Sequence, residues 1–220
     1  MIFSKNDRIV FIGDSVTDMG SLNPVGEGND DCLGRSYVAI INSLLWMSYP
    51  ELVLRVTNSG ISGQTSRDLI ARFDRDVMDL NPDWVSICIG INDVWRQFDR
   101  IVVPECHVYP DEYRKNMEEM VGKLNGKVKG TFIMSPYIMA TSKDDKMRAR
   151  MDEYVAICKD VAEKNGCVFI NLQQLFDNYL ENQYGYLTSP DRIHPNQLGA
   201  TVIAREFLKH CDYDFNREEY

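Results

Sequence analysis

The sequence predicts an α/β protein, a three-layer α/β/α sandwich around a five-stranded parallel sheet. Short apolar runs, rich in β-branched residues and too short for helices, alternate with longer segments whose apolar residues recur every three or four positions. There is no internal repeat, and 220 residues are enough for one domain, residues 1–220, with a substantial core. Such alternation produces βαβ units with helices on both faces, and we expect the flavodoxin-like strand order.

Strands and helices are predicted in alternation along the chain. Strands are expected at residues 9–12, 52–57, 84–89, 130–134 and 168–171. Amphipathic helices are expected at residues 37–47, 65–80, 111–124, 144–164 and 198–209. The segments 21–34 and 99–109 show neither pattern and are predicted to be irregular, the first of them shaping the mouth of a binding site.

The composition is acidic, with 33 Asp and Glu residues against 24 Lys and Arg and a formal net charge of −9. Nucleic acids and anionic membrane surfaces need a basic footprint, so neither is an expected partner, and a neutral or sugar-like substrate fits better. Six cysteines form no C-x-x-C pair and no Cys/His metal spacing, which is typical of reduced thiols. Without a signal-peptide pattern or an apolar run near ~20 residues, we expect a cytoplasmic protein that does not enter a membrane.

Unusual residues follow the ends of three predicted strands. Asp14 and Ser15 come directly after the first strand. Gly60 follows the second strand, and Asn92 follows the third. The carboxyl ends of parallel strands meet at one edge of a sheet, so these residues are expected to converge on one crevice. Ser15 is the candidate nucleophile, and a serine hydroxyl becomes reactive only when a base removes its proton.

Histidine is the usual base for a serine, because its ordinary pKa lies near 6.5. Of the three histidines, His210 ends a predicted helix and is interpreted as structural, and His107 lies in the irregular segment and is interpreted as a surface or rim residue. His194 stands just before a helix, with Asp191 three residues earlier, so one turn brings the carboxylate to the imidazole. A solvated capping turn is the other reading of this pair.

Acyl transfer by such a serine also needs hydrogen-bond donors for the negative charge of the tetrahedral intermediate. The backbone N–H groups of Ser15 and Gly60 and the side-chain amide of Asn92 are the candidates. Taken alone, Gly60 and Asn92 also fit ordinary turn positions.

Two other functions fit parts of the pattern. Asp14, Asp18 and Asp93 could ligate Mg²⁺ in a phosphohydrolase, and the same scaffold could serve as a sugar-binding module without catalysis. Ser62 lies between two glycines, but the chain contains no G-x-S-x-G elbow and no G-x-G-x-x-G or P-loop motif.

Taken together, the blocks Gly13-Asp14-Ser15-Val16, Gly60, Gly90-x-Asn92-Asp93 and Asp191-x-x-His194 resemble the SGNH hydrolases, a branch of the GDSL esterase/lipase family. The first block has valine where the family name has leucine. The resemblance implies the SGNH hydrolase fold, with Ser15 as nucleophile, His194 as base and Asp191 as its orienting partner. It further implies an oxyanion hole of Ser15, Gly60 and Asn92, with no metal and no cofactor.

A narrower resemblance is to the acetylxylan esterases and related carbohydrate acetylesterases, through residues 60–65, 83–86, 90–97 and 191–195. It implies a carboxylic ester hydrolase that removes acetyl groups from xylo-oligosaccharides or similar sugars. Substrate contacts are expected at Asp14, Gly63, Trp95 and Arg96. Trp95 and Arg96 suit a sugar platform and a polar anchor, or else a packed indole and a surface arginine.

The runner-up function is an esterase or lysophospholipase-type lipase on other small acyl esters. Long acyl chains fit poorly, because the loops near the site are polar. A homo-oligomer is left open, since Trp46, Met47 and Tyr49 near a helix end suit either an interface or the core.

Overall fold

One mixed sheet forms the centre of the molecule. The computed structural model describes residues 1–28, 30–140 and 142–217, and in these ranges six strands lie in the order β2-β3-β1-β4-β5-β6. Their bounds are β1 Arg8–Gly13, β2 Gly26–Glu27, β3 Arg55–Gly60, β4 Trp84–Cys88, β5 Gly130–Met134 and β6 Val168–Ile170.

The five predicted strands are β1, β3, β4, β5 and β6, and all their pairings are parallel. Their order is the flavodoxin-like one, which confirms the predicted fold class. The sixth strand, β2, is antiparallel to β3 and was missed. It has only two residues in a loop rich in Gly, Asn and Asp, so it carries no periodicity that a sequence could show.

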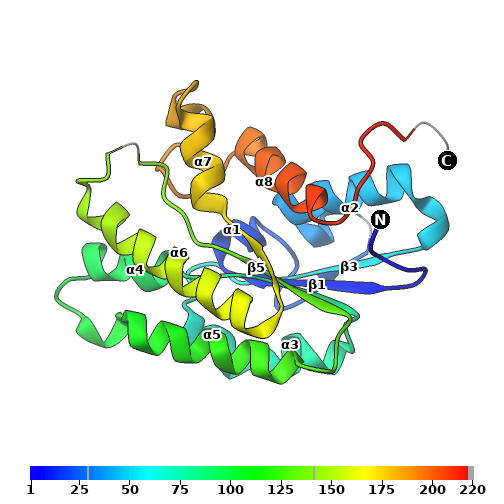
Figure 1. Ribbon diagram of the computed structural model, residues 1–220, viewed down its shortest axis with the longest axis horizontal. Helices are drawn as coiled ribbons and strands as arrows, with labels where there is room; N and C mark the ends of the chain where they lie inside the picture. The colour runs from blue at the N-terminus through cyan, green and yellow to red at the C-terminus, as the bar shows by residue number, and fades with distance from the viewer. Residues whose placement is uncertain (29, 141, 218–220) are drawn as a thin grey trace.

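Helices cover both faces of the sheet, with α2 and α8 on one face and α3, α5 and α6 on the other (Figure 1). Three short helices, α1, α4 and α7, were not predicted. The apolar residues of α4 and α7 do recur at helical spacing, at 91, 94, 95 and 98 and at 172, 175, 176 and 180, so this signal was present in the sequence and was missed. The bounds are α1 Ser15–Asp18, α2 Tyr37–Ser48, α3 Ser66–Asp76, α4 Ile91–Asp99, α5 Pro110–Leu124, α6 Lys146–Asn165, α7 Leu172–Leu180 and α8 Gln197–Lys209.

The register of the strands aligns their carboxyl ends. Gly13 at the end of β1 pairs with Gly60 in β3 and with Cys88 in β4. The apolar residues 9–12 of β1 are fully buried between the two helical layers. The chain therefore delivers the segments after β1, β3 and β4 to the same edge, as expected for a parallel sheet.

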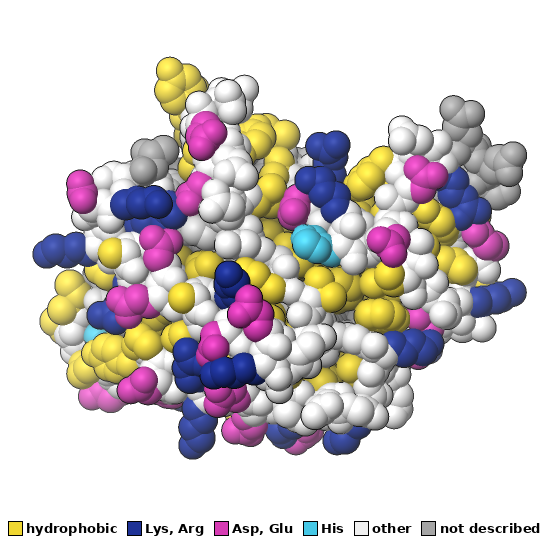
Figure 2. All heavy atoms as spheres, viewed as in Figure 1, with side chains coloured by type: hydrophobic (Ala, Val, Ile, Leu, Met, Phe, Trp, Pro, Cys, Tyr) yellow, Lys and Arg dark blue, Asp and Glu magenta, His cyan; other side chains and the backbone are white. Residues whose placement is uncertain are grey.

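The mixed charge of the surface and the absence of disulfides among the cysteines are as the sequence leads us to expect. Basic and acidic side chains are interspersed on the face shown in Figure 2. All six cysteines are free thiols, and Cys88, Cys158 and Cys211 are buried. Trp46 and Met47 are exposed on α2, whereas Tyr49 is buried. Among the described residues, no helix combines the length and apolar character needed to cross a bilayer.

Candidate active site

Ser15 is presented by the sharp turn that leaves β1. Asp14 caps the short helix α1 by accepting the Val16 N–H at 3.0 Å, and Ser15 is the first residue of that helix. The Ser15 Oγ lies 2.9 Å from Nε2 of His194, which comes from a position 179 residues further along the chain. The hydroxyl is therefore in hydrogen-bond contact with a potential base.

The turn before α8 holds His194 in place through Asp191. One oxygen of the Asp191 carboxylate lies 2.5 Å from Nδ1 of His194. The other oxygen accepts the backbone N–H groups of Ile193 at 3.0 Å and His194 at 2.8 Å. Partial burial acts to raise the pKa of Asp191, but the hydrogen bonds from His194 and Ile193 outweigh it and lower this pKa to about 2. The ionised carboxylate fixes the tautomer in which Nε2 can accept a proton from Ser15.

The other two histidines are structural. His210 is at the end of α8 with Nε2 3.6 Å from a Glu206 oxygen. His107 was expected at the surface or the rim but is buried, with its ring nitrogens 3.2 Å from the Tyr109 hydroxyl and 3.0 Å from the Arg100 carbonyl. The prediction for His107 was wrong because the segment around it packs against α4 and the residue that follows it, with bonds to Gln97 and Arg100.

Gly60 was expected to donate its N–H to an oxyanion, and the structure contradicts this. The Gly60 N–H donates to Oδ1 of Asn58 at 2.9 Å inside the protein. A Cβ on Gly60 would lie 2.3 Å from the backbone nitrogen of Asp18. Glycine is needed here for the close approach of β3 to α1, not for contact with a substrate.

Gly63, three residues further on, does line the pocket around Ser15. Its φ of +82° is left-handed, which favours glycine. Among the described residues, the N–H groups of Gly63 and Ser15 have no protein acceptor. Asn92, also in the pocket, donates one amide hydrogen to the Gln64 carbonyl at 2.9 Å and retains another. Sequence reasoning had placed Gly63 among substrate contacts, but had assigned the donor to Gly60.

A buried carboxylate from α1 holds the loop that carries Gly63. One oxygen of Asp18 accepts the Ser62 N–H at 3.1 Å and the Ser62 hydroxyl at 2.5 Å. The other oxygen accepts the N–H and hydroxyl of Ser21 at 3.0 and 3.1 Å. Asp18 therefore ties the loop of Gly63 to the loop that follows α1. The sequence had suggested Asp18 only as a metal ligand.

Asp14 was expected to contact substrate, but only 1% of its surface is exposed. Burial raises the pKa of Asp14 to about 6, although the Val16 N–H and the charge of a protonated His194 act to lower it. Its Oδ2 atom is buried and has no hydrogen-bond partner among the described residues. The expected substrate contact was wrong because the capping geometry turns the carboxyl group into the protein.

Trp95 and Arg96 form one side of the pocket, which has a volume of about 370 Å³. The Trp95 ring meets the His194 ring edge to face, with centroids 5.9 Å apart. Arg96 lies over the indole, and its Nη2 donates to Oδ1 of Asn92 at 3.0 Å. Both residues thus line the pocket, and both also support its other side chains.

The acidic residues do not assemble into a metal site. Asp93 is buried and accepts the N–H and hydroxyl of Ser66 at the start of α3, while Asp18 is occupied by two serines. Burial raises the pKa of Asp93 to about 7. Within the described ranges, no group of three or more His, Cys, Asp or Glu side chains is arranged to hold a metal ion.

A serine, a histidine and an aspartate in hydrogen-bonded series at the carboxyl edge of a parallel sheet define a serine-dependent acylhydrolase of the SGNH type. The model of the GDSL-like lipase/acylhydrolase family matches residues 11–202, so the chain belongs to this family.

Full-length relatives agree with this family. The chain is 42% identical to an acetylxylan esterase of Geobacillus stearothermophilus over 217 residues, 99% of both chains. The crystal structure of the acetylxylan esterase Axe2 from that organism covers 100% of both chains with a TM-score of 0.96 at 42% identity. Three Axe2 structures described as catalytic mutants, S15A, D191A and H194A, also cover 100% of both chains at 42% identity, with TM-scores of 0.96, 0.97 and 0.97.

Proposed function

We propose that this protein is a serine esterase that removes acetyl groups from xylo-oligosaccharides or closely related sugars. The observation that carries the proposal is the series from Ser15 Oγ through His194 to Asp191, with separations of 2.9 and 2.5 Å. The catalytic mutants of Axe2 replace residues of the same type and number, and that relative is described as an acetylxylan esterase.

In the first half of the reaction, Ser15 attacks the carbonyl carbon of the acetyl ester. His194 Nε2 accepts the serine proton as the new C–O bond forms. When the tetrahedral intermediate collapses, His194 gives that proton to the departing sugar oxygen, and the bond between the carbonyl carbon and that oxygen breaks. The acetyl group remains on Ser15 as an ester.

In the second half, water attacks the acetyl group on Ser15. His194 takes a proton from the water and returns it to the Ser15 oxygen, which releases acetate and restores the hydroxyl. Asp191 stabilises the imidazolium that exists between the two transfers. The same residues therefore serve both halves with their roles reversed.

The oxyanion of both intermediates is stabilised by three donors: the N–H groups of Ser15 and Gly63 and the side-chain amide of Asn92. All three residues line the same pocket, and both N–H groups lack a protein acceptor in the ranges that the structure describes. Arg96 fixes the orientation of the Asn92 amide by donating to its oxygen at 3.0 Å. Removing one such donor typically lowers turnover about 10²–10³-fold.

A sugar ester suits the remainder of the pocket. Trp95 offers an apolar ring face and Arg96 offers donors, a combination that recognises the faces and hydroxyls of a sugar. Acetylated sugar is thus the expected partner. An esterase for other small acyl esters is the alternative, and a panel of substrates separates the two.

The test measures acetate released from acetylated xylose and acetylated xylotriose, beside p-nitrophenyl acetate and p-nitrophenyl octanoate. We expect rapid turnover of the acetylated sugars, and a loss of several orders of magnitude in Ser15→Ala. Ser43→Ala, an exposed serine on α2, is the matched control and should keep full activity. Turnover of p-nitrophenyl esters without release of acetate from the sugars would reject the carbohydrate assignment.

A further inference from the structure

A second cavity of about 360 Å³, the outer cavity, lies beside the catalytic pocket. Gly63 and Arg96 line both spaces, so the two meet at these residues. Beyond them, the outer cavity is lined by the start of α3, the end of α4 and the segment 103–106. A substrate held over Ser15 can therefore extend past Arg96 into the outer cavity.

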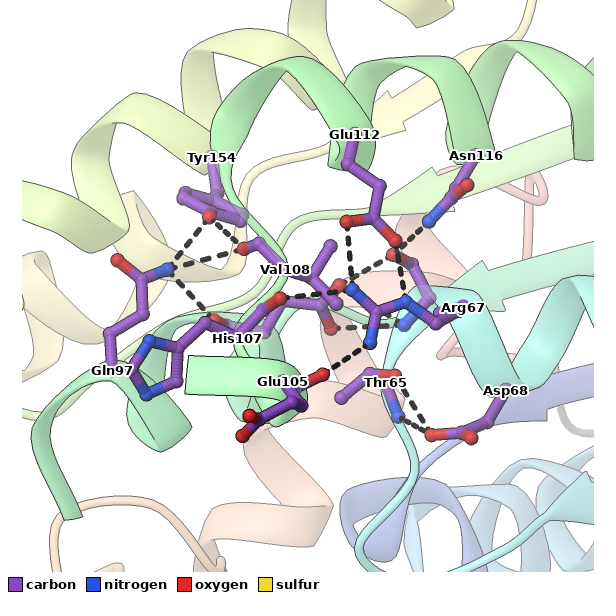
Figure 3. Close-up of polar contacts among 12 residues, drawn as sticks. Thr65, Arg67, Asp68, Gln97, Glu105, His107, Val108, Glu112, Asn116 and Tyr154 are labelled. Carbon is purple, nitrogen blue, oxygen red and sulfur yellow. Dashed lines mark hydrogen bonds and ion pairs between the residues drawn. The ribbon is translucent and has the colours of Figure 1, made fainter. Parts of the chain in front are cut away.

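The far wall of the outer cavity is fixed by Arg67 (Figure 3). Its guanidinium donates to the carbonyls of Glu105 and His107 at 2.8 and 3.0 Å. The same group forms a two-point ion pair with Glu112 of α5, at 2.6 and 2.8 Å. Because four bonds to one guanidinium hold this segment against α3 and α5, the outer cavity is a built feature of the fold.

Arg100 differs from the other arginines of the outer cavity. Arg67 and Arg96 are both held in ion pairs. The exposed guanidinium of Arg100 has no partner among the described residues, and it lines the cavity. Its backbone is nevertheless fixed, because its carbonyl accepts from His107 Nε2 at 3.0 Å. Arg100 thus carries donors without a protein acceptor in the described ranges, on a backbone that is held in place.

Two acceptors line the same cavity. Asp68 uses Oδ2 to accept the N–H and hydroxyl of Thr65 (Figure 3), and its Oδ1 has no donor in the described part of the chain. Glu105 also lines the cavity, and its carboxylate has no protein donor in those ranges. An anionic ligand would meet two carboxylates beside one uncommitted guanidinium. A neutral sugar satisfies both kinds of group, since each hydroxyl can donate and accept.

We propose that the outer cavity is a subsite for the neighbouring sugar of an oligosaccharide whose acetylated unit occupies the catalytic pocket. Arg100 donates to a hydroxyl of this neutral sugar, and Asp68 and Glu105 accept from others. Small-ligand sites commonly enclose about 300–1,000 Å³, so a volume of about 360 Å³ accommodates a sugar unit. The inference rests on the proposed esterase function, and it makes the enzyme selective for chain length.

The first test compares wild type with Arg100→Ala on p-nitrophenyl acetate, acetylated xylose and acetylated xylotetraose. We expect kcat/KM on acetylated xylotetraose to fall about 10-fold, mainly through KM, and the two smaller substrates to change less than about twofold. Lys127→Ala, which removes an exposed cation from the turn before β5, is the control and should change none of the three. Equal losses on all three substrates, or no loss on acetylated xylotetraose, would overturn the subsite.

The second test is independent of hydrolysis. Calorimetry measures the affinity of unacetylated xylotetraose for Ser15→Ala with and without Arg100→Ala, and we expect about a 10-fold loss in the double variant. If acetylated sugars are not hydrolysed but this loss is found, the esterase assignment fails and the subsite stands. Equal affinity for both variants would refute the subsite. An effect of Arg100 confined to xylotetraose bearing a glucuronic acid would refute the neutral-sugar assignment.

Discussion

Replacing Asp18 by asparagine tests whether a residue outside the Ser15–His194–Asp191 series controls catalysis through the oxyanion loop. The carboxylate accepts four hydrogen bonds, two from Ser21 and two from Ser62. An asparagine can accept on only one side, and its NH₂ group then faces two donors on the other. One of the two loops must therefore lose its anchor.

The size of the effect follows from the bonds that are lost. Hydrogen bonds to a charged group contribute about 1.5–3 kcal/mol each. Losing an oxyanion donor such as the Gly63 N–H costs up to about 3–4 kcal/mol in the transition state. Because Asp18→Asn displaces that donor without deleting it, we expect kcat to fall about 10–100-fold while KM changes less than about threefold. Steady-state hydrolysis of p-nitrophenyl acetate measures both constants.

Two further variants separate positioning from simple loss of stability. Asp7→Asn removes another buried carboxylate that accepts from Ser4 and Trp84, at the opposite edge of the sheet. It should lower the melting temperature but leave kcat unchanged. Ser62→Ala keeps the backbone N–H bond to Asp18, so its kcat should lie between those of wild type and Asp18→Asn. A folded Asp18→Asn enzyme with the kcat of wild type would refute the positioning role.

Three other perturbations have definite outcomes. Asp191→Asn should lower kcat about 10⁴-fold on p-nitrophenyl acetate because the imidazole loses its fixed tautomer. In wild type, protonation of Asp191 should not reduce activity above about pH 4, since the pKa of this carboxyl is about 2. The folded-state pKa of Asp14 is raised from 3.8 to about 6, so the folded protein keeps a proton that the unfolded chain releases, and the free energy of unfolding falls as pH rises through this range. Urea denaturation at pH 4.5 and pH 7 should show a decline that is about 2 kcal/mol larger in wild type than in Asp14→Asn, because Asp93, whose pKa is also raised, lowers the stability of both proteins over this range. An equal decline in both proteins would contradict the assignment. Gly60→Ala should cost more than about 2 kcal/mol in thermal unfolding because its Cβ would lie 2.3 Å from a backbone nitrogen, whereas Gly122→Ala, in open space on α5, should be neutral or stabilising.

The residues of the Ser15–His194–Asp191 series could be found from the sequence because the segments next to them in the chain determine where they lie. Ser15 follows directly after a buried strand. In a parallel sheet the carboxyl ends of all strands lie at the same edge, so the position of Ser15 at that edge follows from the sequence. Asp191 and His194 are separated by one turn, so their contact needs no long-range packing. Only the contact between His194 and Ser15 depended on the fold.

The oxyanion donor could not be found in this way. Which N–H is free depends on where side chains bind in the folded protein, both those of neighbouring residues and those of distant segments. The Asn58 side chain takes the Gly60 N–H, while the loop held by Asp18 leaves the Gly63 N–H without an acceptor in the described ranges. The Asn58 bond is local, but an asparagine two residues before a glycine does not by itself show that the bond forms, and the Asp18 contact joins segments far apart in the sequence. The same holds for β2, which is a strand only because β3 lies beside it.

The most direct measurement of the central claim is covalent labelling with a fluorophosphonate, followed by peptide mapping with mass spectrometry. The reactive serine displaces fluoride and keeps the phosphonyl group, so the adduct identifies the nucleophile. We expect one adduct on Ser15, whose Oγ lies 2.9 Å from His194 Nε2, and a strong loss of labelling in His194→Ala. An adduct on Ser62 or another serine, or labelling that does not depend on His194, would contradict it.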